Sequence, residues 1–590
     1  MDKKIGVKDY FSSLFYAFKI ILSTNIFYPI IQIGLMFIQN TLPFIGLYIF
    51  NDLMNQLSAE NIDSRRAILT AVYFIAFSGI QMLCGCMLNL LRSILLDKMN
   101  LKCQELFIKK QLDIPMSFSD TSHGRDVIGA AQNEITNIHA LFDVFMEFVC
   151  DIYAFIVAAR ILISFNIIYA VVFLVLIIPS CVSSHRETAV FDKFNFKNMA
   201  QNRFHSYYRQ ILTGQGTAKD VRLYNLTDPL KKRYFDLHNK YLHERKRLKL
   251  SFMKVKSFYK ILQLLGMCGF LLALINAKFS NTITVGDLVM YSGIALTYVS
   301  KASDIANGFD NSVMIVRWLQ PVFEFLNISG SEDRKDGVEL SSFESLEFKN
   351  VYFKYPCTDS YVLKGVSFRI NRNERVSLVG LNGAGKSTIV KILIGLYEVE
   401  SGEILINGIS VKEYSSHTVR SLFSVLLQDY PSYALTMREN IMLSDIAHRN
   451  DEKAVMSLRK AGFDDSMCDL DCYMTRAFDD KGLELSNGQW QKIAVARTYF
   501  KDAPIVILDE PSSALDAESE EQIFNIFSEL SEDRTSLMIT HHISGVINSD
   551  KILVLDNGVI KESGNHSELM QICGIYKQMF DLQKSRYEEK

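Results

Sequence analysis

Residues 380–388, GLNGAGKST, have the composition of a phosphate-binding loop. Gly380 and Gly385 stand five positions apart and are followed by a lysine and two hydroxyl residues. Glycine lets the backbone approach phosphate groups, while successive N–H groups and the start of the next helix attract their charge. A strand-like run, Arg375–Val379, precedes the loop and a helical pattern follows it, as this motif requires.

The loop also supplies two side chains with distinct chemistry. Lys386 can place its charge between the β- and γ-phosphates of a nucleotide, and the Ser387 hydroxyl can ligate Mg²⁺. We therefore expect ATP and Mg²⁺ to bind here. The loop residues expected to contact the nucleotide are Gly380, Asn382, Gly383, Ala384, Gly385, Lys386, Ser387 and Thr388.

A second acidic motif completes this predicted site. Residues 505–516 read IVILDEPSSALD, so a buried strand ends in Asp509 and Glu510. Asp509 can hold Mg²⁺ directly or through water, and Glu510 can polarise an attacking water. The alternative, two solvated acids at a strand end, is disfavoured because the motif follows the phosphate loop at a plausible distance.

The first half of the chain is apolar. The runs 20–51, 67–91 and 161–184 carry no charge and exceed the roughly 18–20 residues that cross a bilayer. Buried core helices would explain one such run more readily than three. Weaker runs bring the total to six predicted spans, at 20–51, 67–91, 142–165, 166–184, 261–277 and 284–305.

Lysine and arginine gather in the segments 98–140 and 185–260, which the positive-inside rule places in the cytoplasm with both termini. Both segments are poor in Gly and Pro, so we expect helices that continue beyond the membrane. Aromatic residues at helical spacing in 7–20 predict a short interfacial helix, unless the first span simply starts early.

The ten cysteines are expected to be free thiols. A net charge of −2 argues against a nucleic-acid partner.

The composition changes after residue 326. A polar, turn-rich linker at 327–342 leads to alternating apolar strands and helical patterns. We predict a multidomain chain: an all-α transmembrane domain of six helices with long cytoplasmic extensions (1–326), followed by an α/β P-loop NTPase domain (343–590).

Taken together, these motifs resemble those of an ABC transporter, specifically an exporter-type half-transporter of the bacterial cytoplasmic membrane. The resemblance implies that Tyr355 stacks on adenine and that Gln428 senses Mg²⁺. It implies that Ser513–Asp516 crosses to a partner and that His541 contacts the γ-phosphate. The implied catalytic residues are Lys386, Gln428, Glu510 and His541, with Asp516 in the nucleotide site and Ser387, Gln428 and Asp509 on the metal.

The same resemblance identifies LSNGQ, residues 485–489, as the family's LSGGQ signature. In the family this motif closes on ATP held by another subunit, through Ser486, Asn487, Gly488 and Gln489 here. One chain therefore needs a second one, and we favour a homodimer over a heterodimer. Asn487 replaces a glycine; asparagine tolerates positive φ, so the loop is expected to keep its shape. The replacement could also slow hydrolysis.

Two cytoplasmic stretches, 116–128 and 217–225, resemble the family's coupling segments, although ordinary loops are the alternative. The mechanism implied is alternating access driven by ATP. Residues 485–516 resemble exporters of lanthipeptides and related peptides; a lipid or multidrug exporter and a non-transport membrane ATPase are the alternatives. No Cys–His pair precedes the first span, since His123 is the first histidine, so we do not expect leader cleavage.

The third span carries an acidic stripe, Asp143, Glu147 and Asp151, with one acid every four residues. Charges in a membrane are costly and usually serve a purpose. The stripe could form a cavity wall that attracts cationic substrates. Alternatively, it could pair with basic residues on neighbouring helices.

Overall fold

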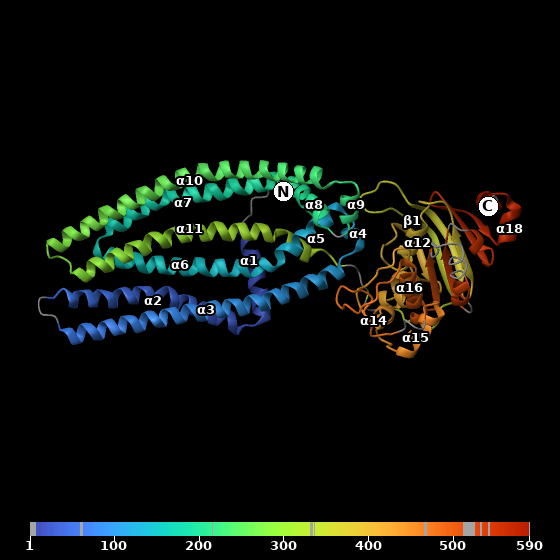
Figure 1. Ribbon diagram of the computed structural model, residues 1–590, viewed down its shortest axis with the longest axis horizontal. Coiled ribbons are helices and arrows are strands. Elements are labelled where there is room, and N and C mark those ends of the chain that lie inside the picture. Colours follow the sequence, from blue (N-terminus) through green and yellow to red (C-terminus); the bar gives the residue numbers. More distant parts are fainter. Residues whose placement is uncertain are drawn as a thin grey trace. The chain divides into compact units, whose positions relative to one another are not determined.

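The computed structural model describes residues 7–59, 63–214, 216–330, 334, 337–464, 469–510, 525–531, 534–540 and 543–588. The chain divides into two compact units. The first unit contains residues 1–111 and 127–327, and the second contains residues 112–126 and 328–590. The short segment 112–126 thus groups with the C-terminal unit (Figure 1).

The first unit is helical. Its helices are α1 (Val7–Thr24), α2 (Phe27–Leu57), α3 (Ser64–Asp113), α5 (Ser122–Glu134), α6 (Ile138–Phe165), α7 (Ile167–Lys197), α8 (Met199–Thr213), α9 (Ala218–Leu223), α10 (Thr227–Phe279) and α11 (Val285–Asn327). Helix α4 (Met116–Ser119) and the first residues of α5 belong to the second unit. Among the described residues, five stretches are helical, long and apolar enough to cross a membrane: α2, α3, α5–α6, α7 and α10. The sixth predicted span, 284–305, lies in α11 except for Thr284, and stays a prediction.

Asparagine residues divide two of the apolar runs into separate helices. The Asn25 side chain accepts a hydrogen bond from the backbone N–H of Phe27 at 2.8 Å, where α1 ends and α2 begins. Asn166 does the same for Ile168 at 2.9 Å, between α6 and α7. An Asn side chain that caps free N–H groups favours a new helix start. The predicted run 20–51 therefore belongs to two helices.

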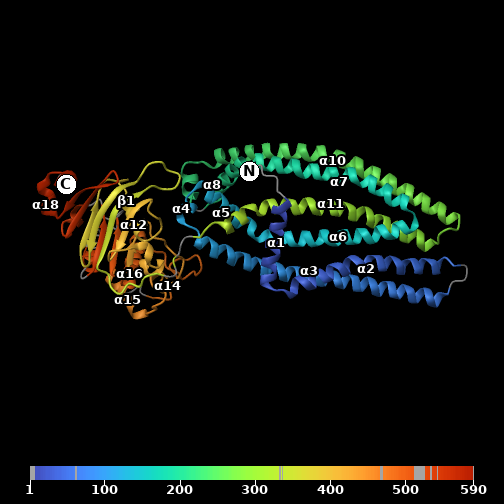
Figure 2. The same ribbon diagram turned by 180° about the vertical axis from the view of Figure 1, so that it is seen from behind.

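Helix α6 lies at the centre of the first unit and packs against α11, α2, α7 and α1. Ala154, Ala158 and Leu162, four residues apart, are completely buried along one face of α6. Small residues at this spacing let neighbouring helix backbones approach closely. Helices α7 and α10 run side by side in both views (Figures 1 and 2).

The second unit contains two sheets. One is antiparallel with strand order β2-β1-β4-β5, and the other has the order β10-β9-β3-β8-β7-β6 with a parallel centre. The strands are β1 (Ser345–Phe353), β2 (Leu363–Asn371), β3 (Arg375–Val379), β4 (Ser401–Ile406), β5 (Ile409–Ser410), β6 (Phe423–Leu426), β7 (Ile505–Asp509), β8 (Thr535–Ile539), β9 (Lys551–Asp556) and β10 (Val559–Gly564).

Helices surround these sheets in sequence order. They are α12 (Lys386–Leu393), α13 (Ser416–Ser421), α14 (Met437–Met442), α15 (Asp451–Lys460), α16 (Asn487–Lys501), α18 (His566–Ile572) and α19 (Ile575–Glu588). Every residue of β7 is buried, as are Val376–Val379 of β3. Near-continuous apolar burial is typical of parallel strands covered on both faces. The two strands therefore hold the residues that follow them in fixed positions at one edge of the sheet.

Candidate functional site

The loop between β3 and α12 favours glycine at three positions, Gly380, Gly383 and Gly385, since Gly383 too has a positive φ, of +82°. A Cβ atom at Gly380 would lie 2.2 Å from the carbonyl oxygen of Leu555. Gly385 has a φ of +107°, a conformation that residues with side chains rarely adopt. Gly383 and Ala384 lie in the same loop, with Asn382 exposed beside them. The backbone is thus shaped to approach a ligand at the start of α12.

Lys386 is buried, and its ammonium group turns back to the loop. Its Nζ donates to the carbonyl oxygens of Gly380 at 2.9 Å and Leu381 at 3.3 Å. It also lies 3.8 Å from a carboxylate oxygen of Glu510. Burial lowers the pKa of Lys386, although Glu510 and Asp509 oppose this effect. The ammonium group therefore occupies a place next to the loop where phosphate oxygens could replace the carbonyls.

Asp509 and Ser387 meet across the site. The Ser387 hydroxyl donates to Asp509 Oδ1 at 3.2 Å, joining the end of β7 to the first turn of α12. The Asp509 side chain is buried, and this burial raises the pKa of its carboxyl above the usual range; the hydrogen bond from Ser387 acts in the opposite direction. A buried carboxylate of this kind gains most from a bound cation.

Glu510 follows directly and has a backbone φ of +46°. Such a conformation is uncommon for residues other than glycine and is concentrated at functional sites. The backbone N–H of Glu510 donates to the carbonyl of Ile539 at 2.9 Å, which holds the turn. Gln428 Nε2 donates to Glu510 Oε2 at 3.2 Å. Glu510 is therefore held between Gln428 and Lys386, as a group that orients water would need to be.

The donor set fits a magnesium ion. Asp509 and Ser387, which contact each other, offer hard oxygen atoms, which Mg²⁺ prefers, and Mg²⁺ commonly completes its shell with phosphate oxygens and water. Gln428 has an amide oxygen as well, but its amide nitrogen contacts Glu510. Among the described residues, no group of three His, Cys, Asp or Glu side chains could hold a metal by itself. The assignment of Mg²⁺ to these three residues remains a proposal.

Tyr355, expected to stack on adenine, lies next to the loop. Its hydroxyl is 3.0 Å from Thr388 Oγ1, and its ring lies edge-on to Tyr397, with 5.3 Å between the ring centroids. Tyr397 in turn donates a hydrogen bond to Asp120, just after α4 in the first expected coupling segment. The sequence analysis did not identify Tyr397. The only feature of the sequence that could have indicated it is an aromatic residue between α12 and β4.

The signature motif forms the start of α16. Ser486 and Gln489 form a capping box: Ser486 Oγ accepts from the Gln489 N–H, and Gln489 Oε1 accepts from the Ser486 N–H. Ser486 and Asn487 are exposed. In the described part of the chain, neither residue forms a hydrogen bond with the phosphate loop, residues 380–388, of the same chain. This arrangement leaves the motif open to a ligand held elsewhere.

The expected reason for tolerating Asn487 is wrong. Asn487 is the first residue of α16 and does not have positive φ. Its backbone carbonyl accepts a hydrogen bond from the Tyr430 hydroxyl at 3.2 Å. Because the position needs an ordinary helical conformation, asparagine fits without glycine's freedom. Tyr430 is a second residue that sequence reasoning did not find.

The remaining predicted site residues, His541 and Asp516, lie outside the described residues, as do Ser513–Ala514–Leu515 beside Asp516. All nine cysteines in the described part are free.

A polar cavity of about 580 Å³ lies in the first unit among α2, α3, α6 and α11. Glu147 and Asp151 of the acidic stripe line it, together with Asp304. Glu147 pairs with Arg92 at 2.7 Å, and Asp151 with Lys301 at 2.7 Å. The pairing alternative therefore holds for these two acids, which also form part of a cavity wall.

Asp143 differs from the other two acids of the stripe. Its carboxylate accepts a hydrogen bond from Gln32 Nε2 at 2.7 Å. It does not line the polar cavity.

The sequence and the fold both match known proteins. Residues 363–513 match the family model described as ABC transporter. The subtilin transport ATP-binding protein SpaT of Bacillus subtilis is 33% identical over 394 residues, which are 65% of this chain and 64% of that protein. The nisin transport ATP-binding protein NisT of Lactococcus lactis is 27% identical over 94% of this chain and 93% of its own length.

Relatives of another kind match as well. The ATP-dependent lipid A-core flippase of Escherichia coli (strain K12) is 31% identical over 63% of this chain and 64% of that protein. The chain thus spans just under two thirds of the length of the subtilin protein and of the flippase. A solved bacterial Atm1-family ABC exporter with ATP bound shares the fold, with a TM-score of 0.75 at 20% identity over 94% of this chain and 98% of the other.

Proposed function

We propose that this chain, which belongs to the ABC transporter family and is an exporter-type half-transporter by its fold, uses ATP to drive export across a membrane. The observation that carries the proposal is the division of the nucleotide machinery. The phosphate loop and the two acids meet at one sheet edge, while Ser486 and Asn487 of the exposed signature form no hydrogen bond with that loop within the described residues. Two copies arranged head to tail would complete two sites.

The residues of the loop would bind and hydrolyse ATP as follows. Loop N–H groups and Lys386 would bind the β- and γ-phosphates, and Mg²⁺ at Ser387, Gln428 and Asp509 would neutralise charge on them. Glu510 would orient a water against the γ-phosphorus and accept its proton. The bond from that phosphorus to the bridging oxygen would break, releasing ADP and inorganic phosphate. His541 is proposed to contact the γ-phosphate.

We propose that the two states of the transporter differ in closure of this dimer. ATP can shift that equilibrium only by binding the closed form more tightly. Residues 112–126 group with the nucleotide-binding unit although they lie in the chain between membrane helices. They are therefore a direct covalent connection through which closure could reach α3 and α5.

A peptide is the proposed substrate, exported across a bacterial cytoplasmic membrane by a homodimer with its nucleotide-binding units in the cytoplasm. The proposal is supported by similarity to the proteins named for subtilin and nisin transport. Similarity to the lipid A-core flippase favours a second candidate, lipid export.

Reconstitution in lipid vesicles tests the function. Wild-type protein should hydrolyse ATP and move a fluorescent cationic peptide, whereas Glu510→Gln should lower hydrolysis by about a hundred-fold or more while nucleotide binding remains. The matched control is Glu452→Gln, an exposed acid in α15 of the same unit. Transport of a fluorescent lipid in place of the peptide would favour the second candidate. Hydrolysis without movement of either would favour an ATPase that does not transport.

A further inference from the structure

A cationic stripe runs along α10 just before its apolar part. Leu242, Lys246, Lys249, Met253, Lys256 and Lys260 follow one another at alternating steps of four and three residues. This spacing places residues on one helix face and is normally occupied by apolar residues that form a packing seam. Here four of the six positions are lysine, so this face does not have the apolar residues of an ordinary helix-packing surface.

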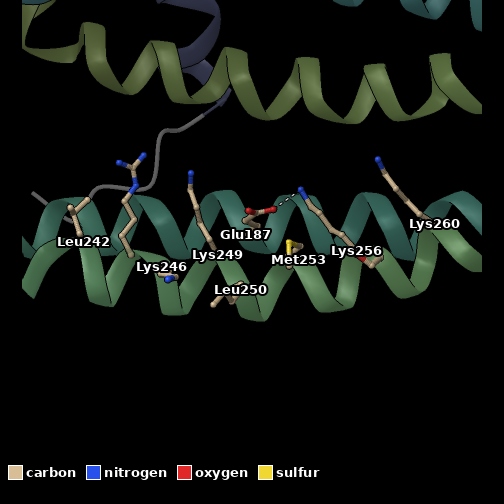
Figure 3. Close-up of a pocket in the computed structure, with 10 residues that line it drawn as sticks. Glu187, Leu242, Lys246, Lys249, Leu250, Met253, Lys256 and Lys260 are labelled. Atoms are coloured by element: carbon tan, nitrogen blue, oxygen red, sulfur yellow. Dashed lines mark ion pairs between the residues drawn. The ribbon is translucent and has the colours of Figure 1, made fainter. Parts of the chain in front are cut away.

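These residues line a groove of about 630 Å³ along α10 and α7. Figure 3 shows Lys249, Lys256 and Lys260 projecting from α10 to the same side, with Glu187 of α7 reaching Lys256. Leu242, Leu250 and Met253 give the groove an apolar part. It therefore combines positive charge with apolar surface.

The positive charge of the groove is largely uncompensated. Its lining contains five cationic side chains, including Arg245, and one carboxylate, a net of +4. The one acid, Glu187, forms an ion pair with Lys256. Within the described part of the chain, Arg245, Lys246, Lys249 and Lys260 form no ion pair. Four like charges along one face repel one another, which an anionic occupant would relieve.

We propose that this groove binds an extended acidic peptide segment, the part of an exported peptide that is recognised on the cytoplasmic side. The inference rests on the proposed function. From Leu242 to Lys260 the helix rises about 27 Å at 1.5 Å per residue. An extended peptide of about eight residues has that length. Acidic residues alternating with apolar ones would match the lysines and the apolar part of the groove.

The length of the stripe distinguishes a peptide from a lipid headgroup. The apolar run of α10 begins at Ile261, directly after Lys260. Anionic lipids attract lysines near the membrane surface, and this attraction decays within a Debye length of about 8 Å. Lys246 lies about 21 Å along the helix from Lys260, so a headgroup could engage only the Lys256–Lys260 end.

The test uses the full chain in nanodiscs of neutral phosphatidylcholine and two labelled probes, an alternating Glu-Leu octapeptide and its Gln-Leu counterpart. The Glu-Leu peptide should bind more tightly, and added salt should weaken its binding. Lys246→Gln with Lys249→Gln should weaken it about ten-fold, since two charge contacts are lost. The control, Lys231→Gln with Lys232→Gln, changes two lysines of α10 outside the groove and should alter affinity less than two-fold.

Three results would overturn the inference. If both peptides bind equally, or if neither binds, the lysine face of α10 is simply exposed to solvent and is not a peptide site. A thermal stabilisation by anionic phosphatidylglycerol that depends on Lys256 and Lys260 alone, without peptide binding, would mean a lipid site. A change in oligomeric mass of the Lys246 and Lys249 variant, with peptide affinity intact, would mean a surface covered by a second copy. The proposed function fails separately, if wild-type vesicles show no ATP-dependent transport.

Discussion

The hydroxyl of Tyr397 donates a hydrogen bond to the carboxylate of Asp120. Tyr397 lies between α12 and β4 and is buried, whereas Asp120 directly follows α4. Burial, and then Asp120 itself, raise the pKa of the Tyr397 hydroxyl, so it remains a donor throughout the physiological range. The ring of Tyr397 also contacts Tyr355 beside the phosphate loop. A continuous path of contacts therefore joins segment 112–126 to the nucleotide site.

Replacing Tyr397 with phenylalanine should loosen this path. The variant keeps the ring and its packing but loses a hydrogen bond worth about 1 kcal/mol. We expect faster hydrogen exchange in residues 112–126 and weaker coupling of hydrolysis to transport, with basal hydrolysis changed less than about two-fold. Hydrogen-exchange mass spectrometry and ATPase assays in vesicles check this. Tyr361→Phe, at an exposed ring of the same unit, is the control; equal exchange in both variants would contradict the path.

Asp509→Asn should stabilise the protein in the absence of nucleotide and magnesium. Because the pKa of Asp509 is raised on folding, its ionisation opposes the folded state, and stability falls as pH rises through that pKa. At pH 7 the asparagine variant avoids this cost and can still accept the Ser387 hydrogen bond. A gain of about 1 kcal/mol would raise the melting temperature by about 2–4 °C. ATP hydrolysis should be lost.

Asp550→Asn supplies a control with the opposite sign. A hydrogen bond from Arg375 lowers the pKa of Asp550, so its contribution to stability is present above the usual pKa and is lost as pH falls. This variant should be slightly less stable than wild type at pH 7 and equal to it near pH 2. Calorimetry of the full chain at several pH values measures both variants. A lower melting temperature for Asp509→Asn at pH 7 would contradict this prediction, because it would show that neighbouring groups offset the cost of burying the charged carboxylate.

The nucleotide site was the part of the molecule most accessible to sequence reasoning. Its motifs are contiguous, and buried strands such as β3 and β7 fix the residues that follow them. The strand–loop–helix context and the neighbouring Asp509 and Ser387 were therefore predictable. The exporter fold was predictable too, because the phosphate loop, the LSNGQ signature and the LDEP motif follow one another in the order that resembles a known family.

Features that depend on contacts distant in the sequence were not predictable. The bond from Tyr397 to Asp120 joins residues 277 positions apart, and neither belongs to a recognisable motif. At the helix break, the Asn25 side chain accepts hydrogen bonds from the first N–H groups of α2, within a run that apolar character alone treats as continuous. At Asn487, the residue type indicated tolerance of positive φ, but only the backbone shows that the position is helical.

A mixing experiment tests whether one copy's phosphate loop works with another copy's signature. Lys386→Ala and Ser486→Arg should each abolish hydrolysis in a homodimer. In a mixed dimer, the loop of the Ser486→Arg chain meets the signature of the Lys386→Ala chain, so one site is intact. Each mixed dimer should therefore keep about half of the wild-type sites.

Phosphate release from co-expressed, differently tagged chains purified through both tags measures this restoration. The control is a dimer of a chain that carries both substitutions and a wild-type chain. In this dimer one site has the altered loop and the other has the altered signature, so neither site is intact. The control dimer should be inactive. If the dimer of the two single variants is inactive as well, the proposal that the loop of one copy works with the signature of the other loses its support. An active Lys386→Ala homodimer would contradict the role of the lysine itself.

The polar cavity among α2, α3, α6 and α11 has acids of the third span in its wall. Changing Asp143, Glu147 and Asp151 to Asn, Gln and Asn removes two acids that line it, leaving Arg92 and Lys301 without their partners. The cavity would then carry excess positive charge and repel cations. Export of a fluorescent arginine-containing peptide should fall about ten-fold, while basal hydrolysis, which depends on the other unit, is retained.

Charge and structural damage can be separated in the same cavity. Adding Arg92→Gln and Lys301→Gln to the triple variant leaves Asp304 as the one charged side chain that lines the cavity, so the net charge returns to −1 as in wild type. Export of the cationic peptide should then recover in part, while export of a neutral peptide should change little in either variant. Vesicle uptake of the two peptides measures the difference. Unaltered uptake of the cationic peptide by the triple variant would mean that the acids serve only to pair with Arg92 and Lys301. Equal loss of both peptides would mean that the ion pairs hold the helices in place.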